Sequence, residues 1–138
     1  MNQIAASFSN LGAMMAPQYA HVLRRHAPRV LREESAQTPL DELVPPSNAS
    51  RRDVVAAMAR AHQAYGAPAA IVLMVVQPGE RNALDQRVFE HSLLADHGVV
   101  LRRLSLAQIA THTSTDADGT MRLKSTGEEI ALVYYRAG

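Results

Sequence analysis

The sequence predicts an α/β fold: a Rossmann-like three-layer domain with a mostly parallel sheet, helices on both faces and a C-terminal hairpin. Residues 69–76 read Ala-Ala-Ile-Val-Leu-Met-Val-Val, an unbroken apolar run typical of a strand buried on both faces. From this run onward, strand patterns alternate with helix patterns, which implies parallel strands joined by right-handed crossovers. At 138 residues, the chain is expected to form a single domain over residues 1–138.

The first fifty residues predict one helix and one connection. Residues 1–8 are interpreted as a short strand that leads into a turn at residues 9–12. Pro17 suits the first turn of a helix, and apolar side chains then recur at helical spacing. Pro28 predicts a kink or a break, because proline lacks the backbone donor. Residues 33–49 are polar, contain three prolines, and are interpreted as a surface connection within the domain.

The helix predicted over residues 51–65 has the clearest pattern in the chain. Ser50 and Asp53 have the spacing of a capping box at its start, and Gly66 is suited to end it. Its expected buried side consists of Val54, Val55, Met58, Ala61, His62 and Tyr65.

The apolar strand at residues 69–76 is expected to end at Pro78-Gly79 and to lead into a helix over residues 83–97. Asn82 is predicted to be the N-cap of that helix, with Asp85 closing a capping box. Apolar residues lie around much of this helix, so we expect it to be covered on more than one side. Gly98 is suited to end it.

The rest of the chain predicts a strand at residues 99–104, a short helix that begins at Ser105 and a turn at residues 116–119. Strands at residues 120–124 and 129–135 are expected to form the C-terminal hairpin, joined through Ser125-Thr126-Gly127.

Parallel pairing would place the carboxyl ends of strands 69–76 and 129–135 at one edge of the sheet, where ligands bind in open α/β sheets. Arg136 would then lie beside Glu80, Asn82 and Gln86. A carboxylate, a guanidinium and two amides can hold an amino-acid head group: Glu80 takes the ammonium, and Arg136 grips the carboxylate with two hydrogen bonds. The simpler alternatives are a capped helix with a solvated loop at residues 80–86, and a surface charge at Arg136.

Other patterns restrict the function further. The six histidines show neither i,i+4 spacing on one helix nor an H-x-H motif, so a metal site is not expected. The P-loop, G-x-G-x-x-G and G-x-S-x-G motifs are all missing from the sequence, so any nucleotide must be held elsewhere.

Charge and composition argue against several classes of partner. The 14 basic and 13 acidic side chains give a net charge of +1, unlike the basic excess of most nucleic-acid-binding proteins. The arginines of residues 24–32 leave open a nucleic-acid contact, although the pattern favours a solvated helix face. The chain has no cysteine, no signal-peptide pattern and no apolar run long enough to span a membrane, which fits a cytoplasmic protein.

Three segments resemble motifs of eukaryotic-type glutathione synthetase. The segment at residues 2–8, Asn-Gln-Ile-Ala-Ala-Ser-Phe, is similar to N-T-I-x-x-S-F. The segment at residues 80–86, Glu-Arg-Asn-Ala-Leu-Asp-Gln, matches E-R-N-x-x-D-Q, and residues 133–138 are similar to V-Y-[FY]-R-[DA]-G-Y. The order and approximate spacing also agree, so the resemblance covers essentially the whole chain.

This resemblance implies part of a homodimeric ligase that joins γ-glutamylcysteine to glycine with ATP and Mg²⁺, through an acyl phosphate. That family pairs an ATP-grasp unit with a substrate-binding α/β domain, and the chain resembles the latter. The resemblance therefore implies γ-glutamylcysteine and glutathione as ligands, and the missing ATP-grasp part of the same polypeptide as partner. The fragment alone is expected to be inactive, to contain no catalytic residue and to bind no cofactor tightly. The alternative is a free-standing α/β ligand-binding or regulatory module without catalytic activity.

The resemblance also implies roles for individual residues, which are the substrate-binding set Ile4, Ala5, Ala6, Ser7, Glu80, Arg81, Asn82, Gln86 and Arg136, and Asn2 at the Mg²⁺ site. The first four would act largely through backbone groups, and Arg136 would hold the γ-glutamyl end. The sequence departs from the motifs at Gln3, Ala5 and Ala137, where many members have Thr, Ser and Asp. The acidic Mg²⁺ ligand expected two residues before Asn2 has no counterpart here.

Overall fold

A computed structural model describes residues 9–30 and 40–136. The predicted site residues between Asn2 and Ser7, and the predicted strand at residues 1–8, therefore lie outside the described residues, as do positions 33–39 of the predicted connection. The described elements are, in chain order, α2 (Ser9–Val30), α3 (Leu40–Leu43), α4 (Ser50–Tyr65), β1 (Ile71–Val75), α5 (Ala83–His97), β2 (Leu101–Leu104), α6 (Leu106–His112), β3 (Thr113–Thr115), β4 (Met121–Leu123) and β5 (Ile130–Tyr135).

The sheet that organises the fold contains three parallel strands in the order β2-β1-β5. Leu73 of β1 lies between Arg102 of β2 and Val133 of β5, and both pairings are parallel. Every residue of β1 is at most 1% exposed, because the strand is central in the sheet and covered on both faces. The predicted buried central strand and the parallel pairing are therefore confirmed.

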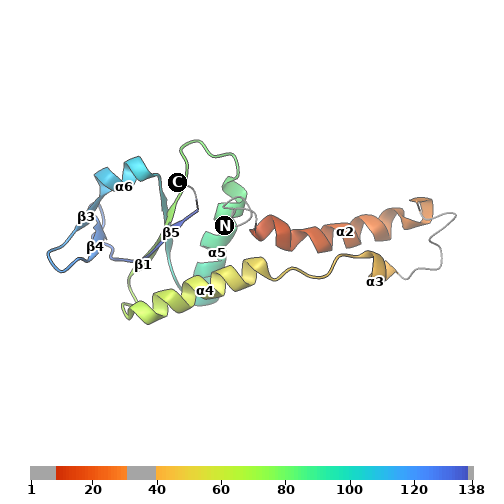
Figure 1. The fold of residues 1–138 in the computed structure, drawn as a ribbon, viewed down its shortest axis with the longest axis horizontal. Coiled ribbons are helices and arrows are strands. Elements are labelled where there is room, and N and C mark those ends of the chain that lie inside the picture. Colours follow the sequence, from red (N-terminus) through yellow and green to blue (C-terminus); the bar gives the residue numbers. More distant parts are fainter. Residues whose placement is uncertain (1–8, 31–39, 137–138) are drawn as a thin grey trace.

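Side chains of β1 alternate between two apolar clusters, one on each face of the sheet. Val72 and Met74 pack with residues of α4 and α5, including Met58 and Phe89. On the opposite face, Ile71 and Leu73 belong to a cluster formed with β4, β5 and α6. Figure 1 shows this layering, and it also shows α2 extending away from the sheet. The α/β class and the helices flanking a parallel sheet are confirmed.

The predicted C-terminal hairpin is not confirmed. β5 pairs with β1, whereas β4 pairs in antiparallel fashion with β3, so that Thr113 lies opposite Leu123. β4 and the chain just before β5 share only an isolated bridge between Arg122 and Glu129. The alternating side chains of β5 enter both apolar clusters, so pairing with the buried β1 covers more apolar surface than a two-stranded hairpin would.

The N-terminal predictions need two corrections. The expected turn at residues 9–12 is instead the first turn of α2, and the helix continues past Pro28 to Val30, so no break occurs there, while the alternative of a kink stays a prediction. Two contacts with distant residues hold its start: the Ser50 hydroxyl donates to the Ser9 carbonyl at 2.6 Å, and the Leu11 amide donates to Asp85 Oδ1 at 3.2 Å. Pro28 lies two residues from the helix end, where losing one backbone hydrogen bond is tolerated.

The helix ends follow the predictions better than the helix starts do. Gly66 and Gly98 end α4 and α5 in the left-handed conformation, with φ of 87° and 67°. Neither predicted capping box forms. The N-cap residue of α4 is Ala49 rather than Ser50, and Asn82, the N-cap residue of α5, makes no side-chain cap hydrogen bond. Ser105 does form one with Gln108 at the start of α6.

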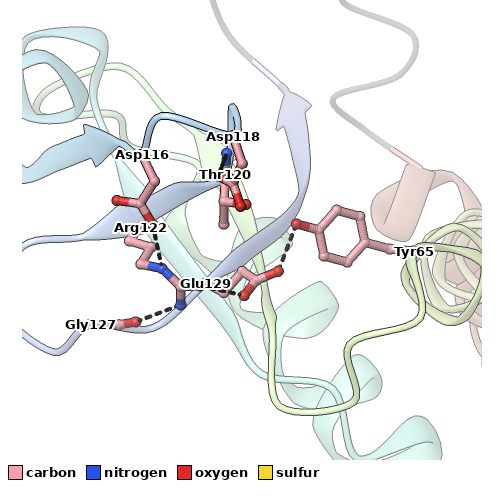
Figure 2. Close-up of polar contacts among 7 residues, drawn as sticks. All are labelled: Tyr65, Asp116, Asp118, Thr120, Arg122, Gly127 and Glu129. Atoms are coloured by element: carbon pink, nitrogen blue, oxygen red, sulfur yellow. Dashed lines mark hydrogen bonds and ion pairs between the residues drawn. The ribbon is translucent and has the colours of Figure 1, made fainter.

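A polar network on the surface ties the end of α4 to the small β3–β4 sheet (Figure 2). Arg122 donates to Asp116 and to Glu129, each at 2.9 Å, and Tyr65 donates its hydroxyl proton to Glu129 at 2.7 Å. Hydrogen bonding to this carboxylate raises the pKa of Tyr65, because the neutral phenol is the donor. The network lies where β5 begins, at the opposite end of that strand from Arg136.

Candidate functional site

The carboxyl ends of β1 and β5 bring Glu80 and Arg136 together, as the parallel topology requires. Val75 pairs with Tyr135 in the sheet register, so the chain after each strand leaves the same edge. Arg136 Nη1 donates to Glu80 Oε1 in an ion pair. The Arg136 side chain is 1% exposed and that of Glu80 is 19% exposed, so this pair is largely removed from water. The alternative of Arg136 as a surface charge is therefore wrong.

Gln86, at the start of α5, contacts the second carboxylate oxygen of Glu80. Its amide Nε2 donates to Glu80 Oε2 at 2.5 Å, while its Oε1 accepts a hydrogen bond from Arg103 Nη1 at 2.9 Å. Glu80 thus receives a different donor on each carboxylate oxygen. The loop at residues 80–86 is therefore more than a solvated helix cap, because its side chains are bonded to β2 and to the end of β5.

Asp85 contributes a second carboxylate that the sequence analysis assigned to a helix cap. Its side chain is fully buried, and Oδ2 lies 3.6 Å from Arg136 Nη2. Its Oδ1 accepts the amide of Leu11 at the start of α2. The sequence does contain a signal for this role of Asp85. Asp85 lies in the first turn of a helix expected to be covered on more than one side, and a buried charged residue needs a partner.

The two remaining predicted residues of this loop differ in their surroundings. Arg81 is exposed and forms no hydrogen bond or ion pair with any residue that the structure describes. Asn82 is partly buried, and its Nδ2 finds no hydrogen-bond partner within the described part of the chain. A buried amide donor without a partner carries a desolvation cost that a ligand acceptor would relieve.

A cleft of about 540 Å³ opens beside this cluster. Glu80, Gln86 and Arg103 line it together with the loop after β1, and Ser105 and Gln108 contribute from the start of α6. Arg103, Ser105 and Gln108 were not predicted from the sequence as site residues. Because β2 also runs parallel to β1, the argument that placed Arg136 at this edge applies equally to residues 103–105 and would have found them.

Tyr134, two residues before Arg136, packs against the apolar cluster on the α4–α5 face of the sheet. Its ring meets the ring of Phe89 edge to face, with centroids 6.3 Å apart. Burial raises the pKa of Tyr134, with the Arg136 charge opposing and the Asp85 charge reinforcing that shift. The phenol is therefore protonated at neutral pH, and the charges of the cluster belong to its carboxylates and guanidiniums.

The cluster offers carboxylates for a cation and guanidiniums for an anion, within hydrogen-bond reach of one another. That arrangement suits a zwitterion such as an amino-acid head group. No group of three His, Cys, Asp or Glu side chains that could hold a metal ion occurs within residues 9–30 and 40–136. In the same ranges, no helix is long and apolar enough to cross a membrane.

Comparison with known proteins relates the chain to one family. The family model described as eukaryotic glutathione synthase matches residues 70–138. The chain is 34% identical to glutathione synthetase of Homo sapiens, in an alignment that covers 100% of this chain and 26% of the human protein. It is 30% identical to the chloroplastic glutathione synthetase of Arabidopsis thaliana, covering 100% of this chain and 24% of the plant protein. The chain thus spans about a quarter of the length of these relatives.

A solved structure supports the fold. The apo structure of a glutathione synthetase-like effector from Globodera pallida superimposes with a TM-score of 0.63 at 16% sequence identity. The match covers 89% of this chain and 28% of that protein. At this identity the similarity concerns the fold alone.

Proposed function

Because the chain belongs to the eukaryotic glutathione synthase family, we propose that it is the substrate-binding domain of a glutathione synthetase. Such an enzyme is the ATP-dependent ligase that joins γ-glutamylcysteine and glycine. The observation that carries the proposal is the Glu80–Arg136 pair with Gln86 at the carboxyl edge of a parallel sheet. The three residues stand at the motif positions for which the family resemblance implies substrate binding.

We propose that the γ-glutamyl end of the dipeptide binds by replacing the internal ion pair. Its ammonium takes the place of Arg136 at Glu80, and its carboxylate receives the freed guanidinium of Arg136. Exchange of one buried ion pair for two others keeps every charge compensated, which is required away from water. The Asn82 amide, with its buried Nδ2, and the Gln86 amide orient the same head group. Arg81 and the backbone of residues 4–7 complete the proposed site.

The described residues contain no cluster of metal ligands. Following the family resemblance, we propose that the nucleotide and metal of the ligase bind in the ATP-grasp part of the polypeptide, with Asn2 at the margin of the metal site. What this chain contributes is to bind the acid substrate and fix its orientation. We further propose that residues 1–138 form a single Rossmann-like domain. We also propose that the protein is cytoplasmic and that the enzyme is a homodimer.

Isothermal calorimetry with γ-glutamylcysteine tests the proposal on the 138-residue chain. Glu80→Gln keeps the size of the side chain but removes the charge that receives the ammonium, so we expect affinity to fall at least about tenfold, equivalent to about 1.4 kcal/mol. Arg136→Lys keeps the buried charge but cannot form the bidentate contact with the substrate carboxylate, so it should weaken binding similarly.

Arg60→Met serves as the control, since Arg60 is exposed on α4 and lies outside the site. A folded Glu80→Gln variant that binds the dipeptide as tightly as the control would contradict the proposed function.

A further inference from the structure

Arg103 joins the cluster from β2, the strand that the sequence analysis did not connect with the site. It pairs with Met74 of β1 in the sheet register, near the carboxyl end of both strands. Its Nη1 donates to Gln86 Oε1 at 2.9 Å, and its Nε lies 3.5 Å from Glu90 Oε2. The Arg103 side chain is 22% exposed and lines the cleft beside Glu80 and Gln86.

The contact with Arg103 determines which way the Gln86 amide faces. A guanidinium has only donors, so it is satisfied by the amide oxygen and repelled by the amide NH₂ group. With Oε1 on Arg103, Nε2 is directed at Glu80 Oε2, where it donates at 2.5 Å. The opposite orientation would place the NH₂ group against a cation and the oxygen against a carboxylate, which are two repulsive contacts. The surrounding charges therefore allow one orientation.

We propose that Arg103 is a positioning residue for substrate binding, which acts by holding the Gln86 amide in the orientation that engages Glu80. This inference rests on the proposed function. The Gln86 donor occupies Oε2 of the carboxylate, so the substrate ammonium exchanges with Arg136 at Oε1 alone. Without Arg103, the Gln86 oxygen loses its donor, so the amide can turn away from Glu80 and the carboxylate loses the fixed donor on Oε2.

A purely structural role makes different predictions. Arg103 also contacts Glu90, and Glu90 accepts from Arg87 at 3.0 Å, so these side chains could simply fasten α5 to β2. If the contacts of Arg103 only attach α5 to β2, their loss lowers thermal stability but leaves the affinity of the folded protein for γ-glutamylcysteine unchanged. The loss of stability on replacing Arg103 would also be the same with and without the Gln86 side chain.

The matched pair for the experiment is Arg103→Met and Arg102→Met. Arg102 precedes Arg103 on the same strand but pairs with Glu128 at 3.0 Å, with its side chain 50% exposed. In calorimetry with γ-glutamylcysteine, Arg103→Met should weaken binding about tenfold, while Arg102→Met should bind like wild type. Arg103→Lys, which restores one donor, should recover part of the loss. In a Gln86→Leu background, Arg103→Met should add little further loss.

A second measurement needs no ligand. In ¹⁵N–¹H spectra, the Gln86 side-chain amide protons should shift in Arg103→Met and stay unchanged in Arg102→Met, because only the first substitution frees that amide. Equal affinity for Arg103→Met and Arg102→Met, or equal loss with and without Gln86, would overturn the inference. If the Gln86 amide shifts as expected but Glu80→Gln binds like wild type, the failure belongs to the proposed function instead.

Discussion

The Asp85 carboxylate lies 3.6 Å from the Arg136 guanidinium, and the two side chains are 0% and 1% exposed. Asp85 also accepts the amide of Leu11. One buried carboxylate therefore connects the start of α2, the first turn of α5 and the end of β5. These are three segments far apart in the sequence, and the last two carry residues of the proposed site.

Replacing Asp85 by asparagine should destabilise the fold strongly. The substitution removes one of the two carboxylates beside the buried Arg136 guanidinium, while the ion pair with Glu80 remains, so we expect a loss of about 1–3 kcal/mol. The free energy of unfolding, measured by urea denaturation, checks this. Asp53→Asn is the control, since Asp53 pairs with Arg52 on the surface, with side chains 62% and 78% exposed, and such pairs contribute about 0–1 kcal/mol. Equal stability of the two variants would show that Asp85 is not held by its partners.

Replacing Arg122 by methionine should loosen the small β3–β4 sheet without unfolding the domain. Arg122 is the common donor to Asp116 and Glu129 in the network of Figure 2. Both pairs are partly exposed, so we expect a loss of about 1 kcal/mol in global stability. Amide hydrogen exchange should accelerate at residues 113–129, while β1 keeps its protection. Unchanged exchange at residues 113–129 would mean that backbone pairing alone holds this sheet.

Glu128 gives an expectation for the acid side of the stability curve. The hydrogen bond from Arg102, reinforced by one from Thr126, holds the pKa of Glu128 below its ordinary value of 4.5. The unfolded chain therefore binds this proton more readily than the folded chain. The contribution of Glu128 to stability is present above pH 4.5 and is lost as the pH falls through the folded-state pKa.

Glu128→Gln removes this titration, so its melting temperature should fall less steeply than that of wild type between about pH 5 and about pH 3. Glu42→Gln, at an exposed position in α3, serves as the control for the loss of a surface carboxylate. A Glu128→Gln curve parallel to wild type would contradict the assigned cause.

The sequence was most informative where one physical constraint dominated. The apolar run at residues 69–76 has no polar side chain to place at a surface, so only a central, doubly covered strand suits it. Gly66 and Gly98 were equally clear, because the left-handed backbone strongly favours glycine. The parallel order then placed Glu80, Gln86 and Arg136 at one edge without any knowledge of side-chain contacts.

The sequence was least informative where several partners compete for one side chain. Asp85 has the spacing of a capping residue, yet it bonds to Leu11, 74 positions away in the chain, and to Arg136. Ser50 similarly donates to Ser9 rather than capping α4. Local spacing cannot rank these partners, since the long-range ones depend on how α2 packs against the domain. The pairing of β4 with β3 escaped prediction for the same reason.

Phe89 provides a test of the core that underlies the site. Its side chain is 0% exposed and packs against Val72 and Met74 of β1, within one cluster, and against the Tyr134 ring. Phe89→Ala should lower the free energy of unfolding by about 3–5 kcal/mol, because the cavity left in a close-packed layer cannot collapse fully. Leu84→Ala on the same helix is the control: Leu84 is 82% exposed, so its loss should change stability by no more than about 0.5 kcal/mol. If urea denaturation gave equal values for the two variants, α5 would not be packed on the sheet through Phe89. The proximity of Gln86 to Glu80 would then need another source of support.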